Sequence, residues 1–301
     1  MDPLVTVIIL NWNNAADTLR CLRSVFACDY PNYQVIVVDN GSRDGSVAVL
    51  RQAYPDLTIL ENGQNLGYTG ANNAGIVKAL GQGADYIFLL NDDAILAPDT
   101  LSWLMTAARS YPQAGFFGPK IFAIEESNRL LSAGGLFDPK WKPRHRGMGE
   151  LDQGQFNQPT AVDYLSGCAL LVSRKAIETV GMLAPQFFAY CEDLEWCYRG
   201  KKRGIMALFI PEAKVWHPDT RRRDDDSVMV TYYSARNMLL FARESNLGLM
   251  TFNYILLSDL RTLFSWSLCS RWKNKKRQRD ALICALLDFA RGRFGKAEGL
   301  L

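Results

Sequence analysis

The sequence predicts an α/β protein: a mostly parallel β-sheet flanked by helices, followed by a helical C-terminal extension. Along the N-terminal third of the chain, short apolar runs rich in β-branched residues alternate with stretches of helical periodicity. Continuous apolar runs are typical of parallel strands buried on both faces, and short links between strand and helix favour right-handed crossovers. With 301 residues, 48% of them apolar, the chain is long enough to bury such a core.

The N-terminal elements follow one another as strand–helix pairs. The apolar runs predict four strands, at Val5–Leu10, Gln34–Asp39, Leu57–Leu60 and Tyr86–Leu90. Helical spacing of apolar residues predicts four helices, at Asp17–Phe26, Ser46–Ala53, Ala71–Leu80 and Pro98–Arg109. The last of these helices begins with proline, which suits a first helical turn. The alternation as a whole predicts a doubly wound sheet.

The alternation ends after Gly115–Phe122. Segment Ser127–Asn157 is rich in glycine, proline and charge, and we expect loops and hairpins there that cover the functional site. The remaining elements are an apolar stretch at Val162–Ser173, a helix at Glu192–Arg203, a short strand at Lys214–His217 and three helices from Val228 onward. We therefore divide the chain into an α/β domain at 1–245, with halves at about 1–122 and 123–245, and a basic helical extension at 246–301.

Composition narrows the class of protein. The net charge of +3 gives no reason to expect a nucleic-acid partner. The seven cysteines are odd in number and lack zinc-site spacing, which favours buried thiols in a reducing compartment. The N-terminus has no basic start, and Val5–Leu10 is too short for the apolar part of a signal peptide. We expect a cytoplasmic protein.

Polar residues concentrate where the four N-terminal strands end. These ends read Asn11-Trp12-Asn13-Asn14, Asp39-Asn40-Gly41-Ser42, Glu61-Asn62 leading to Asn65-Leu66-Gly67, and Asn91-Asp92-Asp93. In an open α/β sheet, ligands bind outside the carboxyl ends of the strands. Asn, Asp and Gly are also ordinary turn formers, and for any single strand end that explanation is equally good. Four such ends together favour a binding site.

The first three strand ends suggest contacts to a nucleotide. Asp39 is suited to accept hydrogen bonds from a base or from ribose hydroxyls, and the amides of Asn11 and Asn13 both donate and accept, as a pyrimidine edge requires. Small residues in Asn65–Gly75, including Gly67 and Asn72, let the backbone approach a phosphate at a helix N-terminus. Neither a Walker A loop nor a G-x-G-x-x-G fingerprint is present.

The Asn91-Asp92-Asp93 end is the most specific candidate site in the sequence. Two adjacent carboxylates after an apolar strand repel each other and are costly to desolvate, so their presence is explained if a cation binds there. Mg²⁺ or Mn²⁺ is commonly held by one or two carboxylates together with substrate phosphates. A cation that bridges a diphosphate stabilises the charge of that leaving group.

Four residues further along the chain are candidates for chemistry. Glu192 and Asp193 begin a predicted helix, where acids are favoured by the dipole, but a carboxylate there is also suited to deprotonate a sugar hydroxyl. Trp196 is a candidate for stacking on a sugar, although a tryptophan at this spacing is as often a core residue. His217 follows a strand-like segment and precedes Pro218, so it is either a structural histidine or a metal ligand.

Five segments together resemble glycosyltransferase family 2, which has the GT-A fold. They are Leu4–Asn14, Val37–Ser46, Asn65–Gly75, Leu90–Ala94 and Glu192–Arg199. The resemblance runs from about Val5 to Phe241 and is closest to the rhamnosyltransferase-like and galactofuranosyltransferase-like branch, which Tyr232–Asn237 also resembles.

The resemblance implies a role for particular residues. Asn91-Asp92-Asp93 is similar to the family's D-x-D motif, with Asp93 as metal ligand, Asp92 and Asn91 toward the nucleotide sugar, and asparagine where many members have aspartate. Asp39 matches the residue that reads the base, and Asp193 matches the catalytic base. His217 lies where related enzymes have a metal-binding histidine, and Ser166-Gly167 resembles a donor-phosphate or acceptor contact.

The function implied is inverting transfer of a sugar from a nucleotide-diphosphate sugar to a saccharide or lipid-linked acceptor in cell-surface polysaccharide synthesis. The branch suggests L-rhamnose from dTDP-rhamnose, with galactofuranose or another hexose as the alternative. A non-catalytic sugar-nucleotide-binding protein is a second alternative. A nucleotidylyltransferase would need a basic, glycine-rich N-terminal signature, which Asn11–Arg20 lacks.

The C-terminal extension combines an apolar helix with basic residues. Leu247–Cys269 is apolar but interrupted by Asp259 and Arg261, so it is a poor spanning helix. Arg271–Arg279 carries six basic residues in nine positions. This pattern fits an interfacial helix on the inner face of the plasma membrane, and it fits equally well helices that pack on the catalytic domain or on a second copy of the chain.

Overall fold

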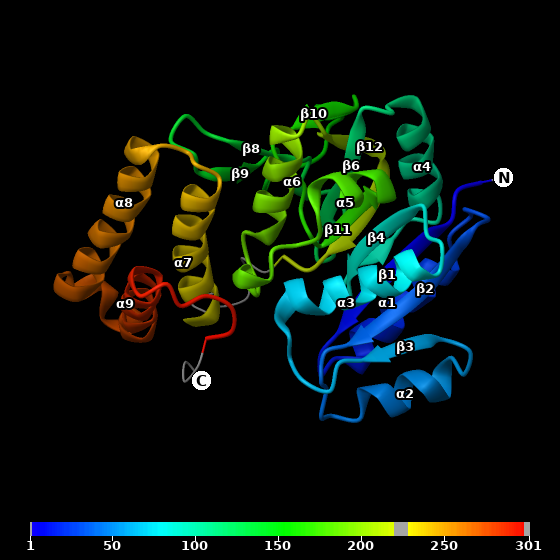
Figure 1. Ribbon diagram of the computed structural model, residues 1–301, viewed down its shortest axis with the longest axis horizontal. Coiled ribbons are helices and arrows are strands. Elements are labelled where there is room, and N and C mark those ends of the chain that lie inside the picture. Colours follow the sequence, from blue (N-terminus) through cyan, green and yellow to red (C-terminus); the bar gives the residue numbers. More distant parts are fainter. Residues whose placement is uncertain (1, 220–227, 298–301) are drawn as a thin grey trace.

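A sheet of ten strands forms the centre of the computed structural model and confirms the predicted α/β class (Figure 1). The structure describes residues 2–219 and 228–297. Along the main path of the sheet the strands are ordered β10-β12-β6-β11-β4-β1-β2-β3, with β5 beside β12 and β7 beside β6. Ile8 and Ile36 pack on one face of the sheet and Val7 and Ile9 on the other, so the strands are buried on both faces as their apolar runs predict.

The N-terminal strands are β1 (Val5–Asn11), β2 (Tyr33–Asp39), β3 (Thr58–Glu61) and β4 (Tyr86–Asn91), all parallel, and each begins or ends within one residue of its predicted bounds. The helices between them are α1 (Ala15–Phe26), α2 (Ser46–Ala53) and α3 (Gly67–Gly81). Asn11 pairs with Asp39, and Asp39 pairs with Glu61. This register aligns the polar strand ends along one edge of the sheet.

The second half of the sheet is mixed. Strand β11 (Ala169–Ser173) runs antiparallel between β4 and β6 (Ala114–Ala123), while β12 (Met206–His217) lies parallel to β6. Short strands β5 (Ile95–Leu96), β7 (Leu130–Ser132) and β10 (Thr160–Val162) add to its edges. The predicted short strand at Lys214–His217 is the end of β12, whose pairing with β6 shifts register between Ile210 and Lys214.

The region predicted as loops and hairpins contains one hairpin, β8 (Gly135–Phe137) paired with β9 (Pro143–His145). Helix α4 (Thr100–Ser110) begins two residues later than predicted, because residues 97–99 form a turn in which the Thr100 amide donates to the Ala97 carbonyl. Helices α5 (Arg174–Val180) and α6 (Glu192–Lys202) follow β11, separated by a short 3₁₀ turn, η1 (Pro185–Phe187).

The three predicted C-terminal helices are present as α7 (Val228–Glu244), α8 (Leu249–Leu268) and α9 (Lys276–Ala290), with a 3₁₀ segment η3 (Ser270–Lys275) before α9. They form a group on the side of the molecule away from β1–β3 (Figure 1). A cluster of Phe188, Tyr232, Tyr233 and Ala285 joins this group to the loop before α6. Within the described part of the chain, no helix has the length and apolar character needed to cross a membrane.

Candidate functional site

Asp93 and His217 lie side by side at the end of the sheet. Strand β12 pairs antiparallel with β5 in a register that sets Trp216 opposite Ile95. Continuing that register by one residue brings His217 past the start of β5 and next to Asp93. Nε2 of His217 is 3.1 Å from Oδ1 of Asp93, and both side chains are mostly buried.

The hydrogen bonds of His217 fix which ring nitrogen can bind a metal. Its Nδ1 is 2.9 Å from the carbonyl oxygen of Pro218, which can only accept, so Nδ1 carries a proton. In the neutral ring the lone pair is then on Nε2, which is 3.2 Å from the amide nitrogen of Asn91. A metal-binding histidine usually donates its other N–H to a carbonyl or carboxylate in this way.

The donor set fits a hard divalent cation that is completed by substrate. Within residues 2–219 and 228–297, no group of three or more His, Cys, Asp or Glu side chains is arranged to hold a metal ion. A carboxylate oxygen and an imidazole lone pair at close distance repel each other unless a cation or proton lies between them. Because Mg²⁺ and Mn²⁺ sites commonly take only a few protein ligands together with substrate phosphates, Asp93 and His217 are the residues that could supply the protein's share of such a site.

Asp193 occupies the first turn of α6, with its carboxylate held by two backbone amides. The Gly167 N–H donates to Oδ2 at 2.9 Å, and the Leu194 N–H donates to Oδ1 at 2.8 Å. Burial raises the pKa of Asp193, while the hydrogen bonds from the two amides and the interaction with His145 lower it in part. Burial, and then the neighbouring Asp193 carboxylate, raise the pKa of Glu192 to about 8. A carboxyl with a raised pKa is a stronger proton acceptor once it is ionised, as a general base requires.

One short segment links the two carboxylate sites. The Asn91 N–H donates to the Cys168 carbonyl at 2.9 Å, while the adjacent Gly167 binds Asp193. The Tyr68 hydroxyl donates to the Gly167 carbonyl at 2.5 Å and fixes the segment from the other side. The donor-phosphate or acceptor contact expected of Ser166 and Gly167 stays a prediction; in the structure the Gly167 N–H contacts Asp193. Burial raises the pKa of Cys168 in this segment, and the charges of both Asp93 and Asp193 raise it further, so the two carboxylates flank the same turn.

The loop before α6 is strained and is held by α7. Phe188, Tyr190 and Cys191 all have positive φ angles, of 63°, 68° and 68°, which non-glycine residues rarely adopt. Nδ2 of Asn237 lies 2.8, 2.8 and 2.9 Å from the carbonyl oxygens of Phe187, Ala189 and Tyr190. Asn237 belongs to the segment Tyr232–Asn237 that resembles the family, but the sequence assigned it no role, because its partners are about fifty residues away in the chain.

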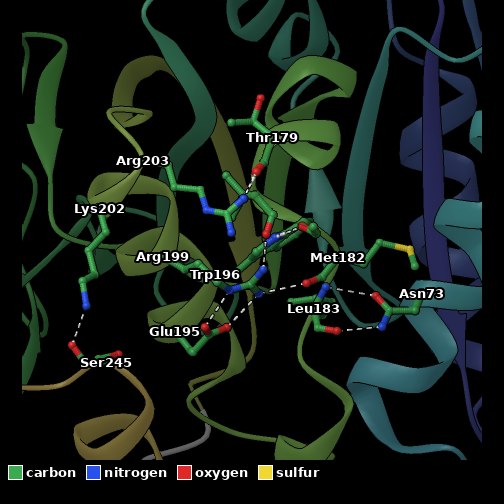
Figure 2. Close-up of polar contacts among 12 residues, drawn as sticks. Asn73, Thr179, Met182, Leu183, Glu195, Trp196, Arg199, Lys202, Arg203 and Ser245 are labelled. Atoms are coloured by element: carbon green, nitrogen blue, oxygen red, sulfur yellow. Dashed lines mark hydrogen bonds and ion pairs between the residues drawn. The ribbon is translucent and has the colours of Figure 1, made fainter.

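Helix α6 is also anchored along its length (Figure 2). Arg199 binds Glu195 through two hydrogen bonds of 2.7 and 2.9 Å and donates to the carbonyl of Met182 at 2.8 Å. Asn73 of α3 exchanges two hydrogen bonds with the backbone of Leu183, at 2.8 and 3.1 Å. These contacts fix the orientation of α6 relative to α3, and with it the position of Asp193.

Trp196 requires a correction. We expected it among the acceptor-binding residues, but its side chain is fully buried, donates to the Gly181 carbonyl at 2.7 Å and packs edge-on against Phe116. It therefore has no face to offer a sugar. We leave it out of the acceptor site and assign it to the core that supports α6.

The residues predicted to bind the nucleotide form a network at the ends of β1 and β2. Asn11 donates to Asp39 Oδ1 at 2.8 Å, and the other Asp39 oxygen accepts from the backbone amides of Gly41 and Ser42 at 3.1 and 3.0 Å. The backbone amide of Asn13 donates to the Ser42 hydroxyl at 2.8 Å. This network holds the strand ends rigid, and it uses part of the hydrogen-bonding capacity of Asp39 and Asn11.

A second network, centred on Asn40, holds the loop before α3. Asn65 Oδ1 accepts from the Gly67 amide at 2.8 Å and from Asn40 Nδ2 at 3.1 Å. Gly67 has a φ of +73°, and a Cβ there would lie 2.5 Å from Phe188, so only glycine fits. Asn72 is buried and donates to the Tyr68 carbonyl of its own helix. Asn40 is a residue that sequence reasoning did not single out.

His145 is a further residue near Asp193 that the sequence analysis did not single out. It ends β9, which lies far from Asp193 in the chain, yet the Asp193 carboxylate raises its pKa while burial lowers the pKa more. Its Nδ1 is 2.9 Å from the Ser132 hydroxyl, and its ring meets that of Tyr164 edge-on at 5.2 Å. No local pattern marks a histidine in a hairpin as part of a site, since the hairpin's placement depends on the whole fold.

Comparison with known sequences gives one family. The family model described as "Glycosyl transferase family 2" matches residues 6–181. The chain is 28% identical over 267 residues to N-acetylglucosaminyl-diphospho-decaprenol L-rhamnosyltransferase of Mycobacterium tuberculosis, covering 81% of this chain and 86% of that protein. It is 25% identical to dTDP-rhamnosyl transferase RfbF of Shigella flexneri, covering 97% of each chain.

Solved structures with the same fold are more distant in sequence. The mannosyltransferase PcManGT from Pyrobaculum calidifontis, solved with GDP-Man and Mn²⁺, has a TM-score of 0.60 at 16% identity, covering 97% of this chain and 88% of that one. GalNAc-T7, solved with UDP, GalNAc and Mn²⁺, has a TM-score of 0.65 at 14% identity, covering 96% of this chain and 57% of that one. These likenesses confirm the expected GT-A fold.

Proposed function

This chain belongs to glycosyl transferase family 2, and we propose that it moves L-rhamnose from dTDP-rhamnose to a saccharide or lipid-linked acceptor in cell-surface polysaccharide synthesis. The glycosyltransferase class follows from the family and its relatives. The choice of rhamnose is supported by two relatives of nearly the same length whose names describe rhamnosyl transfer. A lipid-linked acceptor is supported by the name of the mycobacterial relative.

The observation that carries the mechanism is that Asp193 and the Asp93–His217 pair flank the turn at residues 166–168. In the proposed reaction Asp193 takes the proton from an acceptor hydroxyl, whose oxygen attacks the anomeric carbon of the donor. The bond from that carbon to the diphosphate breaks as the new bond forms, so the configuration inverts and a nucleoside diphosphate leaves. A divalent cation, Mg²⁺ or Mn²⁺, held by Asp93 and His217 would neutralise the charge on this leaving group.

The remaining predicted residues fit the donor and acceptor sides of this reaction. Asn11, Asn13, Asp39, Asn65, Gly67, Asn72, Asn91 and Asp92 are proposed to line the nucleotide-sugar side. Ser166, Gly167 and Glu192 are proposed to line the acceptor side. Asn91 is partly buried, and its amide nitrogen lies 3.2 Å from Nε2 of His217. An aspartate at this position would place a negative charge beside His217 instead of a neutral amide.

The test is a screen of donors for release of the nucleoside diphosphate, with dTDP-rhamnose against UDP-galactofuranose and UDP- and GDP-hexoses. We expect dTDP-rhamnose to react fastest in the presence of Mn²⁺ or Mg²⁺ and an acceptor glycoside. Faster reaction of another sugar would replace rhamnose while leaving the enzyme class intact. Binding of donors with no turnover by any of them would favour the non-catalytic alternative.

We also propose that α8 lies on the cytoplasmic surface of an anionic membrane. Leu257, Leu260, Phe264 and Leu268 are spaced as one helical stripe and are 63%, 43%, 67% and 66% exposed. The basic cluster Arg271–Arg279 begins three residues after this stripe. An exposed apolar stripe next to positive charge fits acyl chains and acidic headgroups, whereas a stripe that packs on a second copy would have no need of the basic cluster.

A further inference from the structure

The first turn of α3 contacts both segments that hold Asp193. Tyr68, the second residue of this helix, donates its hydroxyl to the Gly167 carbonyl at 2.5 Å. The backbone amide of the next residue, Thr69, donates to the Phe188 carbonyl at 3.1 Å. Gly167 binds the Asp193 carboxylate, and Phe188 lies in the strained loop before α6. One helical turn on the nucleotide side therefore contacts the surroundings of the proposed base at two points.

The contact through Tyr68 is short and closely packed. Gly167 accepts from Tyr68 through its carbonyl and donates to Oδ2 of Asp193 through its N–H at 2.9 Å, so a single residue joins the phenol to the carboxylate. A Cβ at Gly167 would lie 2.9 Å from the Tyr68 hydroxyl and 3.6 Å from Cβ of Asp193. The two side chains thus border the same small space, and a side chain at position 167 would displace the hydroxyl or the turn.

The Tyr68 hydroxyl is the donor in this contact, because a carbonyl oxygen can only accept. Burial, which is the main cause, raises the pKa of Tyr68 well above its ordinary value of about 10. The phenol therefore keeps its proton over the whole pH range in which a carboxyl titrates. The hydrogen bond to Gly167 is available in every ionisation state of Asp193.

The turn at residues 166–168 is also attached to the end of β4. The Asn91 N–H donates to the Cys168 carbonyl at 2.9 Å, and Asn91 lies two residues before Asp93. Three elements therefore meet at this turn: β4 through Asn91, α3 through Tyr68 and α6 through Asp193. The distance between the proposed base and the Asp93–His217 pair depends on how firmly the turn is held.

We propose that Tyr68 is a positioning residue that fixes the proposed base, Asp193, relative to the Asp93–His217 pair. Its hydroxyl holds the turn in the orientation that directs the Gly167 N–H at the carboxylate. This inference rests on the proposed function and adds a residue of the nucleotide side that acts on the base. Tyr68 acts through Gly167 and takes no proton, since the proton of the attacking hydroxyl goes to Asp193.

The proposal gives a signed effect on the base. Burial raises the pKa of Asp193, and the Gly167 N–H is the largest of the effects that lower it, because it stabilises the ionised carboxylate. A turn without the Tyr68 hydrogen bond should hold this N–H less well, so the pKa of Asp193 should rise. Tyr68→Phe retains the other titratable groups that interact with Asp193, namely Glu192 and Cys197 of α6, Cys168, Cys191, Tyr164, and His145 of β9.

Tyr68→Phe removes the hydroxyl alone, and Tyr30→Phe is the matched control. The Tyr30 hydroxyl donates to the Pro3 carbonyl at 2.7 Å, so the control loses a hydrogen bond of the same kind at the opposite end of β1. In Tyr68→Phe we expect kcat to fall about tenfold, the size of effect of one hydrogen bond, and the donor dissociation constant to stay within about twofold. The acidic limb of kcat/KM should move to higher pH. Tyr30→Phe should change none of the three.

Three results would overturn the inference. They are an unchanged kcat in Tyr68→Phe, a loss of kcat that is matched by an equal loss of donor affinity, and a loss of kcat with the acidic limb in place. Asp193→Asn adds a further check, because it already lacks the base. Tyr68→Phe should then lower the residual transfer by less than about twofold, whereas a second tenfold loss would show that Tyr68 acts independently of Asp193.

An amide resonance tests the same link without turnover. In protein labelled with ¹⁵N-glycine, the Gly167 resonance, identified by its absence in Gly167→Ala, should shift as Asp193 ionises. Its titration midpoint should lie at higher pH in Tyr68→Phe than in the unmodified protein and in Tyr30→Phe, and an unchanged midpoint would count against the inference. If the midpoint moves as expected but the unmodified protein turns over no donor, the glycosyltransferase proposal fails while the link from Tyr68 to Asp193 stands.

Discussion

Oδ1 of Asp93 lies 3.1 Å from Nε2 of His217, although the two residues lie far apart in the chain. Strand β5 joins them, because it follows Asp93 directly and pairs with the end of β12. The pair therefore depends on the pairing of β5 with β12 as well as on the end of β4.

Removing either member of the pair should weaken cation-dependent donor binding. Asp93→Ala and His217→Ala should each lower transfer by about 10²-fold or more, because the charge of the leaving diphosphate loses its counterion. Calorimetric titration of nucleoside diphosphate with Mn²⁺, and again with chelator, measures the binding. Asp56→Ala, an exposed aspartate elsewhere, is the matched control. Full activity in chelator would exclude a metal role.

Asp193→Asn should separate chemistry from binding. The amide keeps the size of the carboxylate but cannot take a proton, so kcat should fall by about 10²- to 10⁴-fold. The donor dissociation constant should stay within about twofold, since the donor side is built from other residues. Rapid-quench turnover and calorimetry give the two quantities. An equal loss of both would mean that Asp193 binds the donor and is not the base.

Transfer should depend on pH through the Asp193–Glu192 pair. Burial raises the pKa of both carboxyls, that of Glu192 to about 8. Because only ionised Asp193 can act as the base, kcat/KM for the acceptor should fall on acidification well above the ordinary carboxyl range of about 4. The ionised Asp193 raises the pKa of Glu192, so Glu192 is still protonated where Asp193 titrates. Glu192→Gln, which mimics this neutral state, should therefore leave the acidic limb in place. A limb that moves to lower pH would show that Glu192 is charged while Asp193 titrates.

The same pair should affect stability with a defined sign. The folded state holds the Glu192 proton more tightly than the unfolded chain, whose pKa is about 4.3. Its contribution to stability is therefore fully present below pH 4 or so and is lost as pH rises toward about 8. Between pH 5 and pH 8, the midpoint temperature of thermal unfolding should therefore fall less for Glu192→Gln than for the unmodified protein.

Asn237→Ala should destabilise the loop that carries Asp193. The side-chain amide nitrogen lies within hydrogen-bonding distance of the carbonyl oxygens of Phe187, Ala189 and Tyr190. The variant leaves this strained loop without that donor. We expect a loss of about 1–3 kcal/mol in the free energy of unfolding, measured by urea denaturation, together with a lower kcat. Asn253→Ala, on the exposed surface of α8, should change neither. Normal stability in Asn237→Ala would mean that the loop is held by other contacts.

Charge on the exposed stripe of α8 should remove membrane binding. Leu257→Glu with Phe264→Glu places two acids where acyl chains are expected, so sedimentation with vesicles of phosphatidylserine and phosphatidylcholine should fall to the background level. Val77→Glu, at a position of α3 that is 58% exposed, is the control and should bind as before. Binding that persists in the double variant would exclude this face. A change from dimer to monomer in sedimentation velocity would identify the stripe as an interface between two copies.

The N-terminal half was predictable because its signals are local. An apolar run, a turn and a helical repeat each lie within a few residues, and they place the strands nearly as observed. Burial on both faces of the sheet explains why the runs are continuous. The alignment of polar strand ends then follows from parallel pairing alone, and for this reason the sequence could place Asp39 and Asp93 at the same edge of the sheet.

Other features depended on partners that are distant in the chain. Trp196 has the spacing of a helix face, but only the packing of α5 and β6 decides that this face is covered. His145 carries no local signal, and only the docking of its hairpin on Tyr164 brings it toward Asp193. Asn237 lies on a helix that caps a loop about fifty residues earlier in the chain.

The sequence by itself determined the fold class, the family and the residue types at the strand ends, because these are set by local patterns and by motifs in order. The tertiary structure alone decided which of those residues meet. The Asp93–His217 contact depends on the register of β12 with β5, and the tautomer of His217 depends on the carbonyl of Pro218. The surroundings of Asp193 depend on burial by elements from four parts of the chain, and burial is a property of the folded molecule.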